Sequence, residues 1–220
     1  MCGRFTSSAP GDIVAQTFGL SDVPVLVPRY NLAPTQDVPV IRRRDGTSKL
    51  DLLRWGLIPA WAKDATIGSR LINARAETAA EKPAFRAAFG QRRCIIVATG
   101  FYEWARTRGG KQPWLIRFRD GRPFALAGLW EAWHGRDGIL ETCTIITTEP
   151  NELMATLHNR MPVILHPRDH AKWLDASHQT PENLLTLIKP YPADAMSAHP
   201  VSTLVNNPSN DSPELVVPAS

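Results

Sequence analysis

Short apolar runs are separated by polar residues along the whole of this 220-residue chain, and proline and glycine are spread widely among them. This pattern predicts many short elements joined by turns. Runs that are rich in β-branched, leucine and aromatic residues favour strands. We therefore expect strands over residues 38–43, 50–58, 92–106, 140–148 and 160–166.

Residues 113–133 predict a hairpin. From Trp114 to Arg119 the side chains fall alternately on two faces, as they do in a strand, and Asp120-Gly121 follows as a turn dipeptide. The second arm of the hairpin is then expected to return towards residue 133.

Helices are expected between and after these strands. The stretch TAAEKPAFRAAFG, residues 78–90, predicts a short helix with Pro83 in its first turn. Asn151 is suited to cap a helix over residues 151–158, because its side-chain oxygen can accept from a backbone N–H of the first turn. Further helices are expected over 167–175 and 181–189.

Together these elements predict an α+β fold, with a mostly antiparallel, barrel-like sheet and peripheral helices in a single domain over residues 1–220. The tail after Ala195 is rich in proline, serine and asparagine. We expect this tail to be flexible and only partly packed, with Leu204, Leu215 and Val216 available to pin it down.

The composition is that of a soluble globular protein, with 43% hydrophobic and 21% charged residues. No apolar run approaches the roughly 20 residues that cross a bilayer, and the N-terminus lacks the apolar segment of a signal peptide. The three cysteines, Cys2, Cys94 and Cys143, are too few for a disulfide framework. We therefore expect a cytoplasmic protein whose thiols stay reduced.

Charge permits a nucleic-acid partner without requiring one. The formal net charge is +4 and the isoelectric point about 9.2. Arginine outnumbers lysine, and its planar fork suits bidentate contacts to phosphate. The arginines gather at 42–44, at 92–93 and at 117, 119 and 122, and each group taken alone is more typical of a solvated surface than of a binding site.

Cys2 is the first residue with chemistry of its own. Loss of the initiator Met1 would place a primary amine and a thiol on adjacent carbons of Cys2. Such an aminothiol reacts with aldehydes, because the amine forms an imine that the thiol closes into a five-membered thiazolidine. A cysteine at this position also begins the class II glutamine amidotransferases, which remain an alternative at this point.

Three more polar residues stand in apolar surroundings. Asn73 lies in LINARAET, Glu103 in ATGFYEWAR and His158 in LHNRMPVIL. Burial raises the pKa of an unpaired carboxyl, which suits a general acid or base, and a helix C-terminus favours a protonated histidine. Each of the three has a structural alternative, namely a loop tie for Asn73, an ion pair for Glu103 and a packing role for His158.

Taken in order, the motifs MCGRF, YNLAPTQ, WGLIPAW, INAR, GFYEW, ALAGLW, HNRMPVIL and HPVSTLVNNPSND closely resemble the SRAP family, named for SOS-response-associated peptidase. The resemblance covers essentially the whole chain. It implies a DNA-damage-response protein that recognises abasic sites in single-stranded DNA and crosslinks them through a thiazolidine at its N-terminal cysteine.

The resemblance also implies residue roles. Cys2 would supply both nucleophiles, and Asn73 would hydrogen-bond near the reacting centre. Glu103 would transfer protons during ring opening and imine formation, and His158 would hold or protonate the sugar oxygen. The DNA would be contacted by Arg4, Arg75, Arg160, Trp104 and Thr147.

Other activities remain open behind this one. A thiol peptidase that uses Cys2, Glu103 and His158 comes second, the amidotransferase third and a non-covalent single-strand-binding module fourth. We expect a monomer with no cofactor and no membrane contact. We also expect no metal, because no further ligands complete the histidine group of His166, His170 and His178.

Overall fold

Five strands form a closed barrel, which is the larger of the two sheets of the protein. The structure, a computed structural model, describes residues 2–22, 25–177 and 180–219. Within these residues, every strand of the barrel pairs with two others, and all but one of the barrel pairings are antiparallel. In the order of their pairing the strands are β3 (Asp37–Arg44), β4 (Thr47–Trp55), β10 (Gly138–Thr148), β9 (Phe124–Gly135) and β6 (Arg93–Ala98). The expected α+β fold with a mostly antiparallel barrel is thereby confirmed.

Three short strands extend the barrel at its rim. One of them, β5 (Asn73–Arg75), runs parallel to β10 and pairs residue by residue with Ile145 to Thr147. The other two, β11 (Met161–Pro162) and β12 (Ile164–Leu165), pair with β10 and β9 respectively. This rim carries Asn73 into the site described below.

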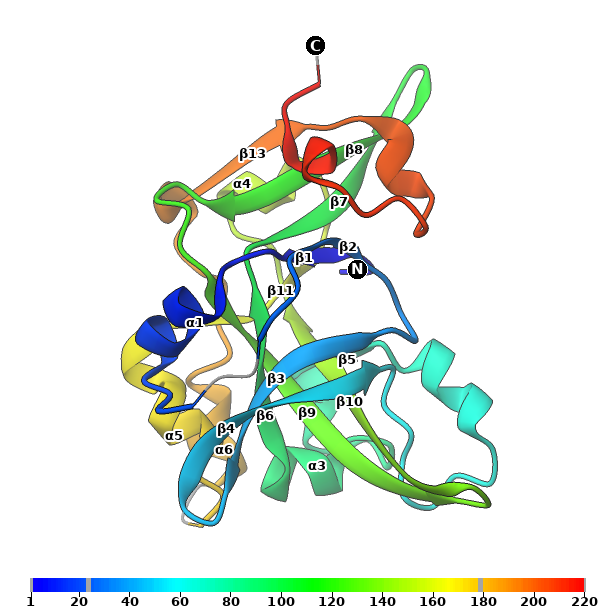
Figure 1. Cartoon of the computed structure of the whole chain (residues 1–220), viewed down its shortest axis with the longest axis vertical. Helices are drawn as coiled ribbons and strands as arrows, with labels where there is room; N and C mark the ends of the chain where they lie inside the picture. The colour runs from blue at the N-terminus through cyan, green and yellow to red at the C-terminus, as the bar shows by residue number, and fades with distance from the viewer. Residues whose placement is uncertain (1, 23–24, 178–179, 220) are drawn as a thin grey trace.

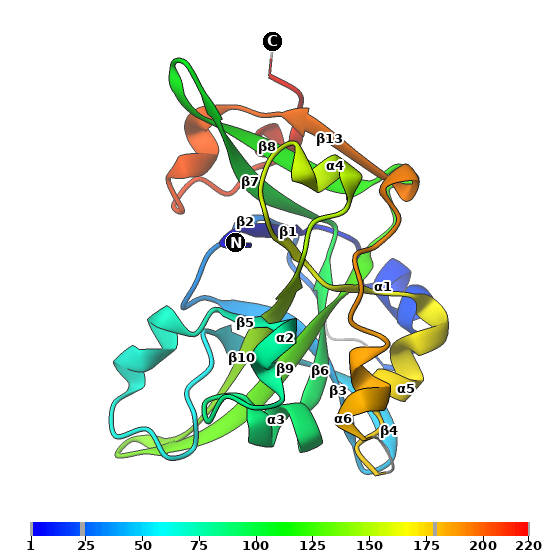
Figure 2. The ribbon, with the colours of Figure 1, turned by 180° about the vertical axis from the view of Figure 1, so that it is seen from behind.

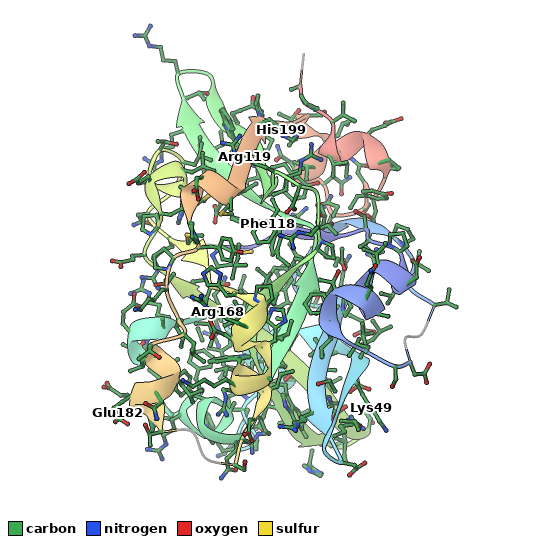
Figure 3. All side chains as sticks on the ribbon, turned by 90° about the vertical axis from the view of Figure 1, so that its left-hand side faces the viewer. Lys49, Phe118, Arg119, Arg168, Glu182 and His199 are labelled. Carbon is green, nitrogen blue, oxygen red and sulfur yellow. The ribbon has the colours of Figure 1, made fainter. Side chains whose placement is uncertain are left out.

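A second sheet lies above the barrel and separates it from the C-terminus (Figure 1). Its strand order is β13 (Met196–Pro200), β8 (Gly110–Phe118), β7 (Gly100–Thr107), β1 (Phe5–Ser7) and β2 (Arg29–Leu32). Within this sheet, β1 and β2 lie on the side nearer the barrel (Figure 1). Figure 3 places Phe118 at the level where the two halves meet, and its ring packs 4.9 Å from that of Phe124 and 4.8 Å from that of Tyr191.

The helices are short and lie on the outside. Seen from behind, α2 lies against the barrel and α4 against the upper sheet (Figure 2). Among the described residues, no helix is both long enough and apolar enough to cross a membrane. The α-helices are α1 (Gly11–Phe18), α2 (Ala76–Ala79), α3 (Arg86–Gln91), α4 (Glu152–Ala155), α5 (His170–Leu174) and α6 (Pro181–Leu185). Short 3₁₀ helices are η1 (Ala65–Arg70), η2 (Pro167–Asp169), η3 (Ala193–Ala195), η4 (Thr203–Asn206) and η5 (Pro213–Val216).

The predicted hairpin over 113–133 is wrong. Its two arms are β8 and β9, which belong to different sheets, and the turn at Asp120-Gly121 carries the chain from one sheet to the other. The hairpins that form instead are β7–β8 and β9–β10. Alternation identified the strands correctly, but it does not identify the partner of a strand.

Two other expected elements are each split in two. The predicted helix over 78–90 becomes α2 and α3. Pro83 interrupts the run, because a proline disfavours the helical conformation of the residue that precedes it. The predicted strand over 92–106 becomes β6 in the barrel and β7 in the upper sheet, with Thr99 between them. There the backbone N–H of Thr99 donates to the carbonyl of Thr6, 2.8 Å away.

The remaining elements agree in position: β3 and β10 are slightly longer than expected, β4 begins and ends three residues earlier, and the helices α4, α5 and α6 are shorter. Asn151 caps α4 as predicted, since its Oδ1 accepts from the N–H of Met154 at 2.8 Å. In the C-terminal segment, Leu215 is 1% exposed, whereas Leu204 is 54% exposed. This segment forms β13, η4 and η5 rather than a loose tail, and His199, visible on β13 in Figure 3, bonds through Nε2 to the carbonyl of Val216 at 3.1 Å.

Candidate active site around Cys2

Cys2 lies directly before β1 and its side chain is completely buried. Asn73, the first residue of β5, donates from Nδ2 to the carbonyl oxygen of Cys2 at 2.8 Å. Its Oδ1 is buried and has no hydrogen-bond partner among the described residues. An acceptor therefore remains beside Cys2, in a place where an unsatisfied polar atom is costly.

Glu103 reaches the same place from β7. This strand pairs with β1 through Phe101 and Phe5, and Glu103 stands two residues after Phe101, on the same face of the strand. Only 3% of Glu103 is exposed. Its negative charge acts on the thiol of Cys2, so the two groups are electrostatic neighbours.

The thiol of Cys2 is held in its protonated form. Burial is the main cause that raises its pKa far above the usual value, and the charge of Glu103 adds to the effect. The backbone N–H of Arg4 acts in the opposite direction and is outweighed. Cys2 in this arrangement is therefore not a preformed thiolate nucleophile.

His158 follows α4 and is held by the backbone of Arg160. The N–H of Arg160 donates to Nδ1 of His158 at 3.0 Å, and the same nitrogen lies 3.2 Å from the carbonyl oxygen of Arg160. The guanidinium of Arg160 donates to both carboxylate oxygens of Glu77, at 2.6 and 3.0 Å, and to the carbonyl of Thr147 at 2.6 Å. These bonds attach the loop that carries His158 to the rim of the barrel. The rim strand there is β10, which pairs with β5, the strand that begins at Asn73.

The expected DNA contacts differ in how accessible they are. Arg75 is exposed and stands two residues after Asn73, on the same face of β5. Thr147 is 0% exposed and its hydroxyl lies 3.5 Å from the carbonyl of Ala74, so in this arrangement it is not available to a phosphate. Arg160 is already paired with Glu77. Of these three residues, Arg75 is the one best placed to meet a backbone.

Arg4 and Trp104 lie against the C-terminal segment. Arg4 donates from Nη1 to the carbonyl of Val205 at 2.8 Å, and its guanidinium carbon lies 6.0 Å from the centre of the Trp104 ring. Trp104 donates from Nε1 to Oδ1 of Asn206 at 2.7 Å. Both residues are partly buried, and both are next to the chemical groups, Arg4 near Cys2 and Trp104 beside Glu103.

A family model described as SOS response associated peptidase (SRAP) matches residues 1–208. The chain belongs to this family. It is 48% identical to the abasic site processing protein YoqW of Bacillus subtilis (strain 168), over 98% of this chain and 99% of that one. It is 33% identical to the abasic site processing protein HMCES of Gallus gallus, over 87% of this chain and 66% of the relative.

Solved structures share the fold of this SRAP chain. A crystal structure of a protein from Bacteroides thetaiotaomicron superposes with a TM-score of 0.88 at 31% identity and covers both chains completely. A second one, from Bordetella bronchiseptica, gives a TM-score of 0.79 at 26% identity over 91% of this chain. The barrel and the upper sheet are therefore shared with these two proteins.

Two residues of this SRAP chain, to which the sequence motifs gave no role, hold candidate site residues in place. Glu77, the second residue of α2 and two residues after the INAR motif, pairs with Arg160. Asn31, within YNLAP, is fully buried and bonds to Arg4. A signal was present for Asn31, because an asparagine beside Leu32 and Ala33 has to find hydrogen bonds once it is buried.

Two histidines of the group for which we expected no metal, His166 and His170, pack against aromatic rings. The ring of His166 stacks on Tyr191 at 4.5 Å and that of His170 on Phe18 at 5.4 Å. His178 lies outside the described residues. Within the described part of the chain, no three histidine, cysteine or acidic side chains are grouped as metal ligands.

The Glu77–Arg160 pair predicts a pH dependence of stability in this SRAP protein. The hydrogen bond from Arg160 is the main cause that lowers the pKa of Glu77 below its usual 4.5. The interaction that lowers this pKa stabilises the folded state fully above pH 4.5, where the carboxyl is ionised in both states. This stabilisation is lost as the pH falls through the lower pKa of the folded state. Because Glu77 is half exposed, we expect the pair to contribute less than about 1 kcal/mol to the free energy of unfolding. Urea unfolding of wild type and Glu77→Gln should differ at pH 7 and converge in acid; a constant difference would contradict this pairing.

Proposed function

We propose that this SRAP protein acts on abasic sites in single-stranded DNA and joins them covalently to Cys2. The observation that carries the proposal is the meeting of Cys2, Asn73 and Glu103, which come from three distant parts of the sequence. The relatives named abasic site processing proteins support the choice of substrate. An abasic sugar in its open form carries the aldehyde that an aminothiol captures.

The proposed reaction needs Met1 to be removed, since the amine of Cys2 is otherwise part of a peptide bond. The freed amine attacks the aldehyde carbon, and loss of water gives an imine. Sγ then adds to the imine carbon, and the thiol proton passes to nitrogen, which closes the thiazolidine ring. Because the thiol of Cys2 is protonated and buried, the amine is the first nucleophile and the N-terminus has to rearrange to admit the sugar.

Glu103 and His158 are assigned the proton transfers in this proposal. The abasic sugar is mostly a closed hemiacetal, so ring opening requires one group to take the hydroxyl proton and another to protonate the ring oxygen. Glu103 is assigned the first task, as well as the protons released during imine formation. His158, held by the backbone of Arg160, is assigned the second. Asn73 orients Cys2 by holding its carbonyl group.

A denaturing gel tests the proposal directly. Mature protein incubated with single-stranded DNA that contains one abasic site should give a slowly migrating species that survives heat and detergent. The same DNA with its abasic aldehyde reduced by borohydride beforehand is the matched control and should give none. A non-covalent binding module would leave no such species with either DNA.

Binding should weaken with salt, because cations of the protein replace counterions along the DNA backbone. Arg75, exposed beside Asn73, is the residue on which to test this. For a single strand each neutralised phosphate contributes roughly 0.7 to the slope of log affinity against log salt. We expect Arg75→Ala to make that slope shallower by about this amount without creating a preference for particular bases. Fluorescence titrations at several salt concentrations measure this slope. An unchanged slope would show that Arg75 does not contact the DNA backbone.

A thiol peptidase is the second candidate, favoured by the family description. Its nearest substrate would be the chain's own Met1, with Cys2 as nucleophile and Glu103 and His158 as proton donors and acceptors. The raised pKa of the Cys2 thiol disfavours this role. Mass spectrometry of protein made without methionine aminopeptidase would show whether Met1 is lost by self-processing.

A further inference from the structure

Asn31, on β2, joins four groups with one buried side chain. Its Oδ1 accepts from Nη1 of Arg4 at 2.8 Å. Its Nδ2 lies within hydrogen-bond distance of three backbone carbonyls, at 3.2, 3.0 and 2.7 Å, those of Val205, Asn207 and Asn210. An amide is suited to this position because it presents an acceptor to the cation and donors to the carbonyls at the same time. No exposed surface of Asn31 remains for a ligand.

The orientation of Arg4 follows from these bonds. Both hydrogens of its Nη1 are used, one towards Asn31 and one towards the carbonyl of Val205. Its Nε is buried. Nη2 is therefore the guanidinium nitrogen that is left for another partner, and Asn31 and Val205 determine the direction in which it points.

The segment that Asn31 binds also holds Trp104. Residues 203–210, here called the C-terminal wall, include Asn206, whose Oδ1 accepts from Nε1 of Trp104 at 2.7 Å. The wall thus contacts Arg4, two residues from the nucleophile, and Trp104, the neighbour of Glu103. Asn31 is the side chain that fixes the wall and the Arg4 guanidinium together.

We propose that Asn31 is a positioning residue for DNA binding, an inference that rests on the proposed function. It preorganises Arg4 and Trp104 as one surface, on which a phosphate and a base of the nucleotides flanking the abasic sugar are bound. A preformed surface binds more tightly because less freedom is lost on association. Among the described residues, Asn31 bonds to Arg4 and to three backbone carbonyls and not to Cys2 or Glu103, so its effect falls on affinity and leaves the chemical step unchanged.

Crosslinking rates measured against the concentration of abasic single-stranded DNA separate these two effects. For Asn31→Ala we expect the half-saturating DNA concentration to rise at least about tenfold, the size expected when a hydrogen bond to a charged group is lost. The rate at saturating DNA should stay near that of wild type. The reaction of Cys2 with a small free aldehyde, which has no phosphate or base, should also be unchanged.

Asp211→Ala is the matched control. Asp211, the residue that follows the C-terminal wall, accepts from the side chain of Arg29 and from the N–H of Tyr30 on β2, and within the described part of the chain it has no hydrogen bond to Arg4 or Trp104. We expect this variant to lose stability and keep its affinity. An equal loss of affinity in both variants would mean that any loosening of the segment suffices, and would overturn the role of Asn31.

If Asn31→Ala does not fold, the exposed residue Asn206 provides the test. Asn206→Ala removes only the bond to Trp104, and we expect the half-saturating concentration to rise roughly threefold. Unchanged affinity in the folded variants, with a wild-type protein that crosslinks, would contradict this inference alone. A wild-type protein that forms no crosslink would instead contradict the proposed function.

Discussion

A chain that keeps any residue in front of Cys2 should form no stable adduct with an abasic site, even though its thiol is intact. Thiazolidine ring closure needs the amine and the thiol of the same residue, and a peptide nitrogen cannot form the imine that comes first. We therefore expect complete loss on a denaturing gel when Cys2 carries a non-removable extension. Loss of the amine has the largest effect that the proposed mechanism predicts.

The control for this experiment is the same extension with a protease site placed so that cleavage leaves Cys2 first. Cleavage should restore the crosslink within a single preparation, which excludes misfolding as the cause. Cys2→Ser should form no thiazolidine, although its amine should still give an imine that borohydride traps. Full, stable crosslinking by the uncleaved protein would refute a mechanism that uses the amine.

Glu103→Gln should bind abasic single-stranded DNA almost as well as wild type and crosslink it far more slowly. Glutamine keeps the size and the hydrogen-bonding reach of the side chain but cannot take up and release a proton near neutral pH. Positioned proton transfer contributes about 10²–10⁴-fold in rate, and we expect a loss in this range. Single-turnover crosslinking at saturating DNA measures it.

Two comparisons make the Glu103 result specific. Glu149→Gln, an exposed glutamate outside the site, should crosslink at the wild-type rate. On an acyclic analogue whose aldehyde is already open, the defect of Glu103→Gln should shrink, because ring opening is the step assigned to Glu103. A wild-type rate of Glu103→Gln on the natural sugar would reduce Glu103 to a structural carboxylate.

The sequence predicted the strands better than their partners. Apolar content and alternation located β3, β4 and β10, since those features report burial. Which strand pairs with which depends on closure of the barrel, and no local pattern records it. This is why the arms of the expected hairpin over 113–133 fell into different sheets.

For the candidate site, the motifs pointed to residues that lie close together in the fold, but they did not point to the residues that support them. Cys2, Asn73 and Glu103 meet through one hydrogen bond and one electrostatic contact, as a shared reaction requires. Residues such as Asn31 act through carbonyl groups of a segment more than 170 residues away. Carbonyls are present in every residue, so a sequence gives no sign of which of them are used.

The bond between Arg4 and the carbonyl of Val205 spans 201 residues and imposes an order on biosynthesis. At about 5–20 residues per second, residue 205 is made roughly 10–40 s after residue 4. Until then the surroundings of Cys2 cannot be completed, and the N-terminus stays open to enzymes that act on nascent chains. Met1 can therefore be removed in this interval, before folding buries Cys2.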